Sequence, residues 1–134
     1  MDEAIRWLEE AVWDLEIAEI LHREKRYNAA AFYSHQASEK ASKALLYYVN
    51  EAPWGHSVRV LLQRFFNSPG LTPVEKLLIC ARGLDRYYMP SRYPNAHPAG
   101  TPHEAYDEES SRRAIECARK VVEYARKTIT RGTS

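Results

Sequence analysis

An arginine and a histidine five positions apart, Arg92 and His97, are the residues of this chain whose types and spacing best suit chemistry. The guanidinium group offers a fixed fork of donors that suits phosphate, and histidine transfers protons near neutral pH. The surrounding segment carries a proline at every fourth position: Pro90, Pro94, Pro98 and Pro102. Because proline fixes φ and reduces the entropy lost on ordering, such a loop can be long without being floppy. The pattern points toward phosphate chemistry.

The spacing alone leaves two interpretations of this pair open. In a bent loop, the side chains of Arg92 and His97 can face one pocket. Alternatively, Arg92 pairs with a surface carboxylate and His97 is an exposed loop residue, since loops collect polar residues for many reasons. On a helix the two would lie on different faces, and the prolines argue against a helix in any case.

A second group of polar residues lies between residues 34 and 43. Gln36, Lys40 and Lys43 recur at helical spacing, and Glu39 can pair with Lys43 at i, i+4. His35 can share a face with Glu39. The periodicity favours a solvated or interfacial helix face here, although a binding site or a dimer surface is also compatible with it.

The apolar pattern predicts the elements that must position these residues. Two long helices are expected over residues 2–24 and 28–50, the second capped by Asn28, and their short connection makes an antiparallel hairpin. A shorter helix is expected over 56–66, with His56 as a candidate cap. All of these segments carry apolar residues at helical spacing, which predicts an all-α fold.

The second half of the chain contains two further helix starts. Thr72, Pro73 and Glu75 form a capping pattern, which predicts a fourth helix that stops before Pro90. The last helix is expected to begin near Asp107, where acidic residues complement the helix dipole, and residues 101–104 are expected to form a brief turn. The sequence therefore predicts an up-and-down helical bundle of four main helices plus a short fifth.

Length and composition set the class of protein. The 134 residues suit a single domain over 1–134, and 45% apolar with 28% charged residues is ordinary for a globular protein. Lys and Arg number 19 against 18 Asp and Glu, so no global charge attracts nucleic acid and any RNA contact must be local or built by two copies.

We expect no membrane span, no signal peptide and a cytoplasmic location. Cys80 and Cys117 lack metal-ligand spacing, and their helical contexts favour packed, reduced thiols; we expect no metal and no cofactor.

Several motifs together resemble the HEPN domain (higher eukaryotes and prokaryotes nucleotide-binding), in its small stand-alone prokaryotic form. The resemblance covers nearly the whole chain. It is carried by Trp7 and Asp14-Leu15, by residues 27–32 (YNAAAF) and 35–45 (HQASEKASKAL), by Gly55-His56-Ser57, and by Arg92-Tyr93-Pro94.

The resemblance implies a helical bundle that commonly dimerises. Many members are metal-independent endoribonucleases, and many are toxins encoded beside a small nucleotidyltransferase antitoxin. Their catalytic pattern is an Arg, four to six residues and a His, which Arg92 and His97 match at the shortest spacing. His97 would then act as general base or acid while Arg92 binds the phosphate. Cleavage would use the substrate's own 2′-hydroxyl, and a dimer would supply the second His.

Two positions depart from the family pattern. Active members often have a polar residue directly after the Arg, where this chain has Tyr93, and toxins silenced by adenylylation carry a Tyr where this chain has Ala99. The alternative function is a non-catalytic helical module that binds a nucleotide or docks a nucleotidyltransferase. The candidate residues for binding RNA or a nucleotide are Gln36, Lys40, Arg86 and Tyr93.

Overall fold

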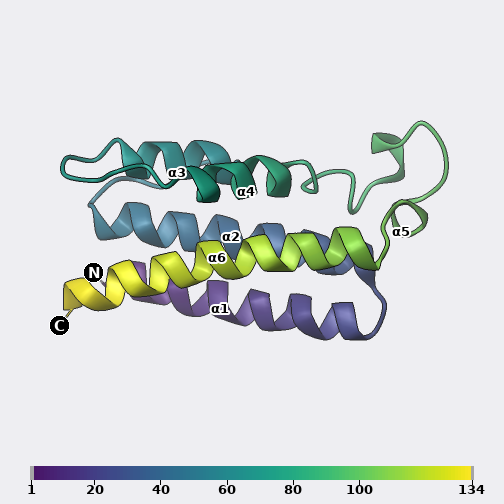
Figure 1. The fold of residues 1–134 in the computed structure, drawn as a ribbon, viewed down its shortest axis with the longest axis horizontal. Helices are drawn as coiled ribbons and strands as arrows, with labels where there is room; N and C mark the ends of the chain where they lie inside the picture. The colour runs from purple at the N-terminus through teal and green to yellow at the C-terminus, as the bar shows by residue number, and fades with distance from the viewer. Residues whose placement is uncertain (1, 134) are drawn as a thin grey trace.

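The computed structural model describes residues 2–133, and every regular element in that range is helical. Three long helices lie side by side: α1 (Asp2–Arg23), α2 (Tyr27–Tyr48) and α6 (Glu108–Thr133) (Figure 1). The shorter α3 (Val58–Phe66) and α4 (Glu75–Asp85) form a second layer on the other side of α2. A 3-10 turn, η1 (Pro94–Ala96), and a one-turn helix, α5 (Pro102–Ala105), lie between α4 and α6. The predicted all-α bundle is confirmed.

Helices α1 and α2 form the predicted antiparallel hairpin, with Lys25 in the left-handed conformation (φ 61°) in the connection. The predicted cap at Asn28 is wrong, because α2 begins at Tyr27 and the capping position belongs to Arg26, which makes no side-chain cap bond. The amide of Asn28 instead donates to the carbonyl of Ser91, at 3.0 Å. This residue therefore fastens the proline-rich loop to α2.

Helix α2 is the centre of the molecule and is lined with small residues. Its fully buried positions include Ala30, Ala31, Ser34, Ala37, Ser38, Ala41, Ser42 and Ala44. The hydroxyls of Ser34, Ser38 and Ser42 each donate to the carbonyl four residues earlier, at 2.8 Å. Because these hydroxyls are satisfied within the helix, they can be buried at little cost. Neighbouring helices can approach α2 closely along this surface.

The starts of α3 and α4 differ from the predicted ones. Ser57 rather than His56 caps α3, with its hydroxyl accepting from the backbone N–H of Val60 at 3.1 Å. The predicted capping pattern at Thr72 is not used, since α4 begins at Glu75 after an extended Val74. Leu71 and Val74, on either side of the unused pattern, pack against the hydrophobic core.

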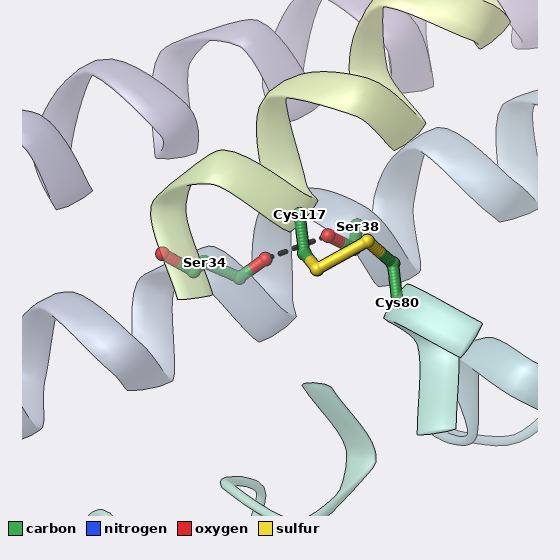
Figure 2. The surroundings of a disulfide bond; sticks show 4 residues. All are labelled: Ser34, Ser38, Cys80 and Cys117. Carbon is green, nitrogen blue, oxygen red and sulfur yellow. Dashed lines mark hydrogen bonds between the residues drawn. A yellow bond between two sulfur atoms is a disulfide. The ribbon is translucent and has the colours of Figure 1, made fainter. Parts of the chain in front are cut away.

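A disulfide bond between Cys80 and Cys117 links α4 to α6, so the prediction of reduced thiols is wrong. The two Cα atoms are 5.2 Å apart although the residues are 37 positions apart in the chain. Figure 2 shows the bond beside Ser34 and Ser38 of α2. Sequence spacing gives no information on this pairing, because it depends on how two distant helices pack.

None of the described helices combines the length and apolar content needed to cross a membrane. Across residues 2–133, no three His, Cys, Asp or Glu side chains gather in a way that suits a metal ion.

Candidate functional site

The guanidinium group of Arg92 is fixed by aromatic rings and one backbone carbonyl. Its central carbon lies 4.2 Å from the ring centre of Phe32, 4.9 Å from that of Tyr88 and 4.8 Å from that of Tyr93. Its Nε donates to the carbonyl of Tyr88 at 3.1 Å. Stacking on rings is a favourable environment for this planar cation, so the side chain has a defined orientation.

Arg92 makes no ion pair with a carboxylate anywhere in residues 2–133. The interpretation in which it pairs with a surface carboxylate is therefore wrong. Its Nε is bonded to the carbonyl of Tyr88, whereas no hydrogen bond among the described residues uses its two terminal nitrogens. A half-buried cation without an acidic partner is suited to an anionic ligand, and those two nitrogens have the geometry for phosphate.

His97 is half-buried and bonded to its own loop. Its Nε2 lies 2.6 Å from the carbonyl oxygen of Pro90. Since a carbonyl only accepts, Nε2 carries the proton in this contact. The neutral ring therefore has its lone pair on Nδ1, which is the form that a general base requires.

The structure does not join Arg92 and His97 through a hydrogen bond or a ring contact within the described residues. The Arg92 side chain packs on Phe32 of α2, whereas the His97 ring is hydrogen-bonded to the carbonyl of Pro90. The loop that carries them is rigidly attached: Ser91 is buried and its hydroxyl donates to the carbonyl of Tyr87. Each side chain is thus fixed separately in one chain.

The other candidate residues lie in three different places. Lys40 forms an ion pair with the buried Asp14 of α1, at 2.7 Å between Nζ and Oδ2. Tyr93 is exposed beside Arg92, and Arg86 lines a hollow between α4 and α6. Gln36 is half-buried on α2 and its side chain makes no hydrogen bond with the rest of residues 2–133. These four residues do not converge on one pocket.

Two polar residues of α2, His35 and Glu39, are buried, so the predicted solvated or interfacial face is wrong for these two, whereas Gln36, Lys40 and Lys43 are partly exposed. His35 is fully buried and Glu39 is 5% exposed. The predicted pair between Glu39 and Lys43 is confirmed at 3.1 Å. The other oxygen of Glu39 lies 3.3 Å from Nδ1 of His56, in the loop before α3. Periodicity missed this, because the α3–α4 layer covers polar side chains that look solvated in the sequence.

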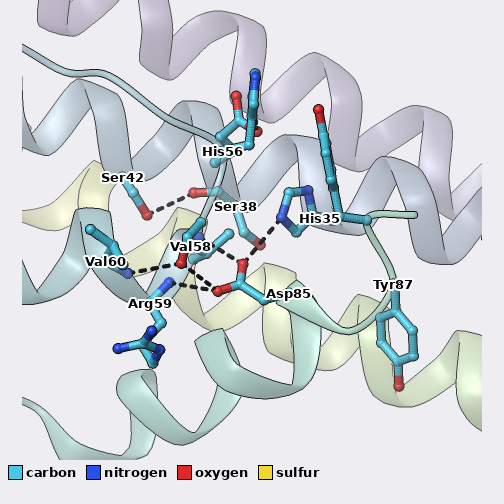
Figure 3. A network of polar contacts seen from close by, with 12 residues as sticks. His35, Ser38, Ser42, His56, Val58, Arg59, Val60, Asp85 and Tyr87 are labelled. Carbon is cyan, nitrogen blue, oxygen red and sulfur yellow. Dashed lines mark hydrogen bonds and ion pairs between the residues drawn. The ribbon is translucent and has the colours of Figure 1, made fainter. Parts of the chain in front are cut away.

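Asp85, at the end of α4, is the centre of this polar network (Figure 3). Its carboxylate accepts from Nε2 of His35 at 3.2 Å, from the hydroxyl of Ser57 at 2.7 Å, and from the backbone N–H groups of Val58 and Arg59 at 2.7 and 3.2 Å. Burial raises the pKa of Asp85, but these four hydrogen bonds together outweigh it and lower the pKa below its usual value. Asp85 therefore caps the N-terminus of α3 from another helix.

Tyr88 connects this network to Arg92. Its ring centre lies 5.0 Å from that of His35 and 5.2 Å from that of the stacked His56. The guanidinium of Arg92 packs on the same ring. The candidate site thus combines a ring-bound arginine with a fixed polar network, and sequence reasoning missed the network.

A fold of this kind, with the Arg92 loop attached to a long central helix, matches one family. The chain belongs to the HEPN domain family, whose model matches residues 4–128.

Three solved structures are similar over nearly their full length. TT1696 from Thermus thermophilus is 34% identical with a TM-score of 0.90, covering 95% of this chain and 98% of that chain. ST0689, an archaeal HEPN homologue, is 35% identical with a TM-score of 0.79, covering 96% and 99%. A HEPN domain protein from Thermotoga maritima, TM0613, is 29% identical with a TM-score of 0.75, covering 94% and 98%. No curated protein matches the chain.

Proposed function

We propose that this HEPN protein is a metal-independent endoribonuclease of the toxin type, in which Arg92 binds a phosphate of the RNA and His97 transfers a proton. The observation that carries the proposal is the half-buried guanidinium of Arg92, which has fixed orientation and no acidic partner in residues 2–133. A cation in that state gains most from an anion that accepts two hydrogen bonds at once.

The state of His97 supports the proton transfer. With Nε2 bonded to the Pro90 carbonyl, Nδ1 of the neutral ring accepts the proton of the RNA 2′-hydroxyl. The 2′-oxygen attacks the adjacent phosphorus, the bond from phosphorus to the 5′-oxygen breaks, and a 2′,3′-cyclic phosphate forms. Arg92 offsets the charge on the phosphate oxygens.

The proposal includes a homodimer, because His97 accepts the 2′-hydroxyl proton on the side of attack, while the leaving 5′-oxygen lies on the opposite side of the phosphorus and needs a proton from a second, protonated imidazole. A second copy supplies a second His97, and it also places two Arg92 loops and two Arg86 side chains on one RNA. The proposal further includes a cytoplasmic location and neutralisation by a small nucleotidyltransferase partner. Each copy is a single domain over residues 1–134.

The test is RNA cleavage in the presence of a chelator. We expect wild-type protein to leave cyclic phosphate ends, and His97→Ala to lose about 10²–10⁴-fold in rate. His103→Ala is the matched control, since His103 is an exposed histidine outside the site, and it should cleave at the wild-type rate. Cleavage that survives His97→Ala unchanged would contradict the assignment.

A second function is favoured by a specific observation. Arg92 and His97 both contact their own chain, which is the arrangement expected where they only hold the loop in place. The protein is then a non-catalytic module that binds a nucleotide or docks a nucleotidyltransferase. The polar face of α2 around Gln36 and Lys40 would then bind the ligand. This alternative predicts thermal stabilisation of wild-type protein by a nucleotide without RNA cleavage, and loss of that stabilisation in Gln36→Ala but not in Arg92→Gln.

A further inference from the structure

A hollow of about 400 Å³ lies between α4 and α6, on the side of α4 that carries the disulfide. It is lined by Ile79, Arg82, Gly83, Leu84, Arg86 and Tyr87 from α4 and its C-terminal end, and by Arg113, Ala114 and Cys117 from α6. This volume falls in the range of small-molecule sites.

The charge of this hollow is positive. Three of its lining residues are arginines and none is acidic. Arg86 makes no ion pair within residues 2–133, whereas Arg82 forms an ion pair with Glu75, at 3.7 Å between Nη2 and Oε1. Arg113 pairs with Glu109 at 2.9 Å through its Nε. Of the three arginines, Arg86 is therefore the one without an acidic partner in residues 2–133, and Arg113 uses only its Nε for its partner.

The spacing of Arg82 and Arg86 is unfavourable for the stability of α4. Residues four apart on a helix are neighbours, and like charges there repel. The helix dipole favours a cation in the last turn of α4, and Arg113, which lines the same hollow from a different helix, is paired with Glu109. An anion between the three side chains relieves this repulsion.

The remaining walls are apolar and open. Ile79 is 58% exposed, and Tyr87 and Leu84 complete the apolar side. Gly83 forms part of the lining, and a Cβ atom added to it would meet nothing within 4 Å. Glycine inside a helix is unfavourable, and here it leaves room where a side chain would intrude.

The disulfide makes this a preformed site. Cys80 and Cys117 link the two helices that form its walls, and Cys117 is itself part of the lining. A fixed separation between walls reduces the ordering cost of binding.

From these features, we propose that the hollow between α4 and α6 binds a phosphate monoester that carries a planar apolar group. The phosphate lies between Arg82, Arg86 and Arg113, and the planar group packs on Ile79 and Tyr87 across Gly83. This site contains neither Arg92 nor His97, although it shares Arg86 with the proposed RNA-binding surface, and binding of a small phosphate ester there does not depend on ribonuclease activity.

The experiment measures binding of phenyl phosphate to the full chain by calorimetry, with phenol and inorganic phosphate as partial probes. We expect saturable binding of phenyl phosphate, weaker binding of inorganic phosphate, and none of phenol. Arg86→Gln should weaken binding by about 10-fold or more, since a charge-assisted hydrogen bond is lost. Arg126→Gln is the matched control, because Arg126 lies about 20 Å further along α6, and it should bind like wild type.

A second variant tests the same site by volume. Gly83→Leu keeps all three arginines and fills the hollow, so it should abolish binding while circular dichroism shows an unchanged helical fold. Arg86→Gln tests the charge even where Gly83→Leu fails to fold. Equal binding by wild type and Arg86→Gln, or no saturable binding of phenyl phosphate at millimolar concentration, would overturn the proposal.

Discussion

At the scale of single side chains, Tyr88 has a role that its sequence position does not reveal. One aromatic ring contacts the buried His35, the exposed His56 and the guanidinium of Arg92. Asp85, three residues earlier, organises the other end of the same network. The position of the Arg92 loop therefore depends on a carboxylate that makes no contact with Arg92 itself.

Replacing Asp85 by Asn tests this dependence. The amide offers one acceptor oxygen in place of two, and its NH₂ group faces N–H and O–H groups that are themselves donors. We therefore expect a loss of about 2–4 kcal/mol in the free energy of unfolding. Urea denaturation measures it. Glu116→Gln, at an exposed position of α6, is the control and should change stability by less than about 0.5 kcal/mol.

The pH dependence of stability follows from the lowered pKa of Asp85. The charged form is favoured in the folded state, so its contribution is present above the unfolded value of 3.8 and is lost as the pH falls through the lower folded value. The stability difference between wild type and Asp85→Asn should therefore shrink as the pH falls below about 4. A difference that stays constant down to about pH 2 would contradict the role of the carboxylate.

At the scale of the helices, the small residues of α2 determine how closely its neighbours approach. Ser34, Ser38 and Ser42 bond within their own helix, so their hydroxyls contribute little to tertiary structure. What matters is their size, because α2 is covered by helices on both sides.

Two substitutions at Ser38 separate size from polarity. We expect Ser38→Ala to change the free energy of unfolding by less than about 0.5 kcal/mol, because a hydroxyl already satisfied within the helix is removed. Ser38→Leu should cost about 1–3 kcal/mol or more through overpacking. Thermal melts of both variants provide the measurement, and a strong loss in Ser38→Ala would show that the hydroxyl has another partner.

Much of the helical layout could be predicted from the sequence, since apolar periodicity marks every long helix. The caps could not, because Asn28 and Thr72 match capping patterns that tertiary contacts override. The buried polar face of α2 was also missed. His35 and Glu39 look solvated by residue type, and only the placement of Asp85 and His56 provides them with partners.

The candidate site, too, could be predicted from the sequence only in part. The segment Arg92–His97 could be selected by composition, yet its aromatic contacts depend on Phe32, far earlier in the chain, and on Tyr88. Tyr88 and Tyr93 are close to Arg92 in the sequence, but no local pattern identifies Phe32 as the third ring.

At the scale of the whole molecule, the disulfide joins the outer α4 to α6 across the side of α2. It closes a long loop that contains the Arg92 segment, and this closure reduces the conformational entropy of the unfolded chain. Intracellular disulfides are common in hyperthermophiles and rare elsewhere, so the oxidation state of this pair is informative about the proposed cytoplasmic location.

Removing the disulfide should lower stability substantially. For a sequence separation of 37 residues, Cys80→Ser with Cys117→Ser should cost about 3–4 kcal/mol, or about 10–15 °C in Tm. Wild-type protein in reductant should melt near the double variant, whereas reductant should leave the variant unchanged. A wild-type Tm that is insensitive to full reduction would contradict this contribution.

The central claim is that the ring-bound guanidinium of Arg92 binds an RNA phosphate, and the salt dependence of RNA affinity tests it most directly. Each phosphate neutralised on a single strand contributes about −0.7 to the slope of log K against log salt. For single-stranded RNA measured by fluorescence anisotropy, Arg92→Gln should weaken binding and flatten the slope by about 0.7 per site, whereas Arg92→Lys should keep most of the slope. Identical slopes and affinities for wild type and Arg92→Gln would contradict the claim.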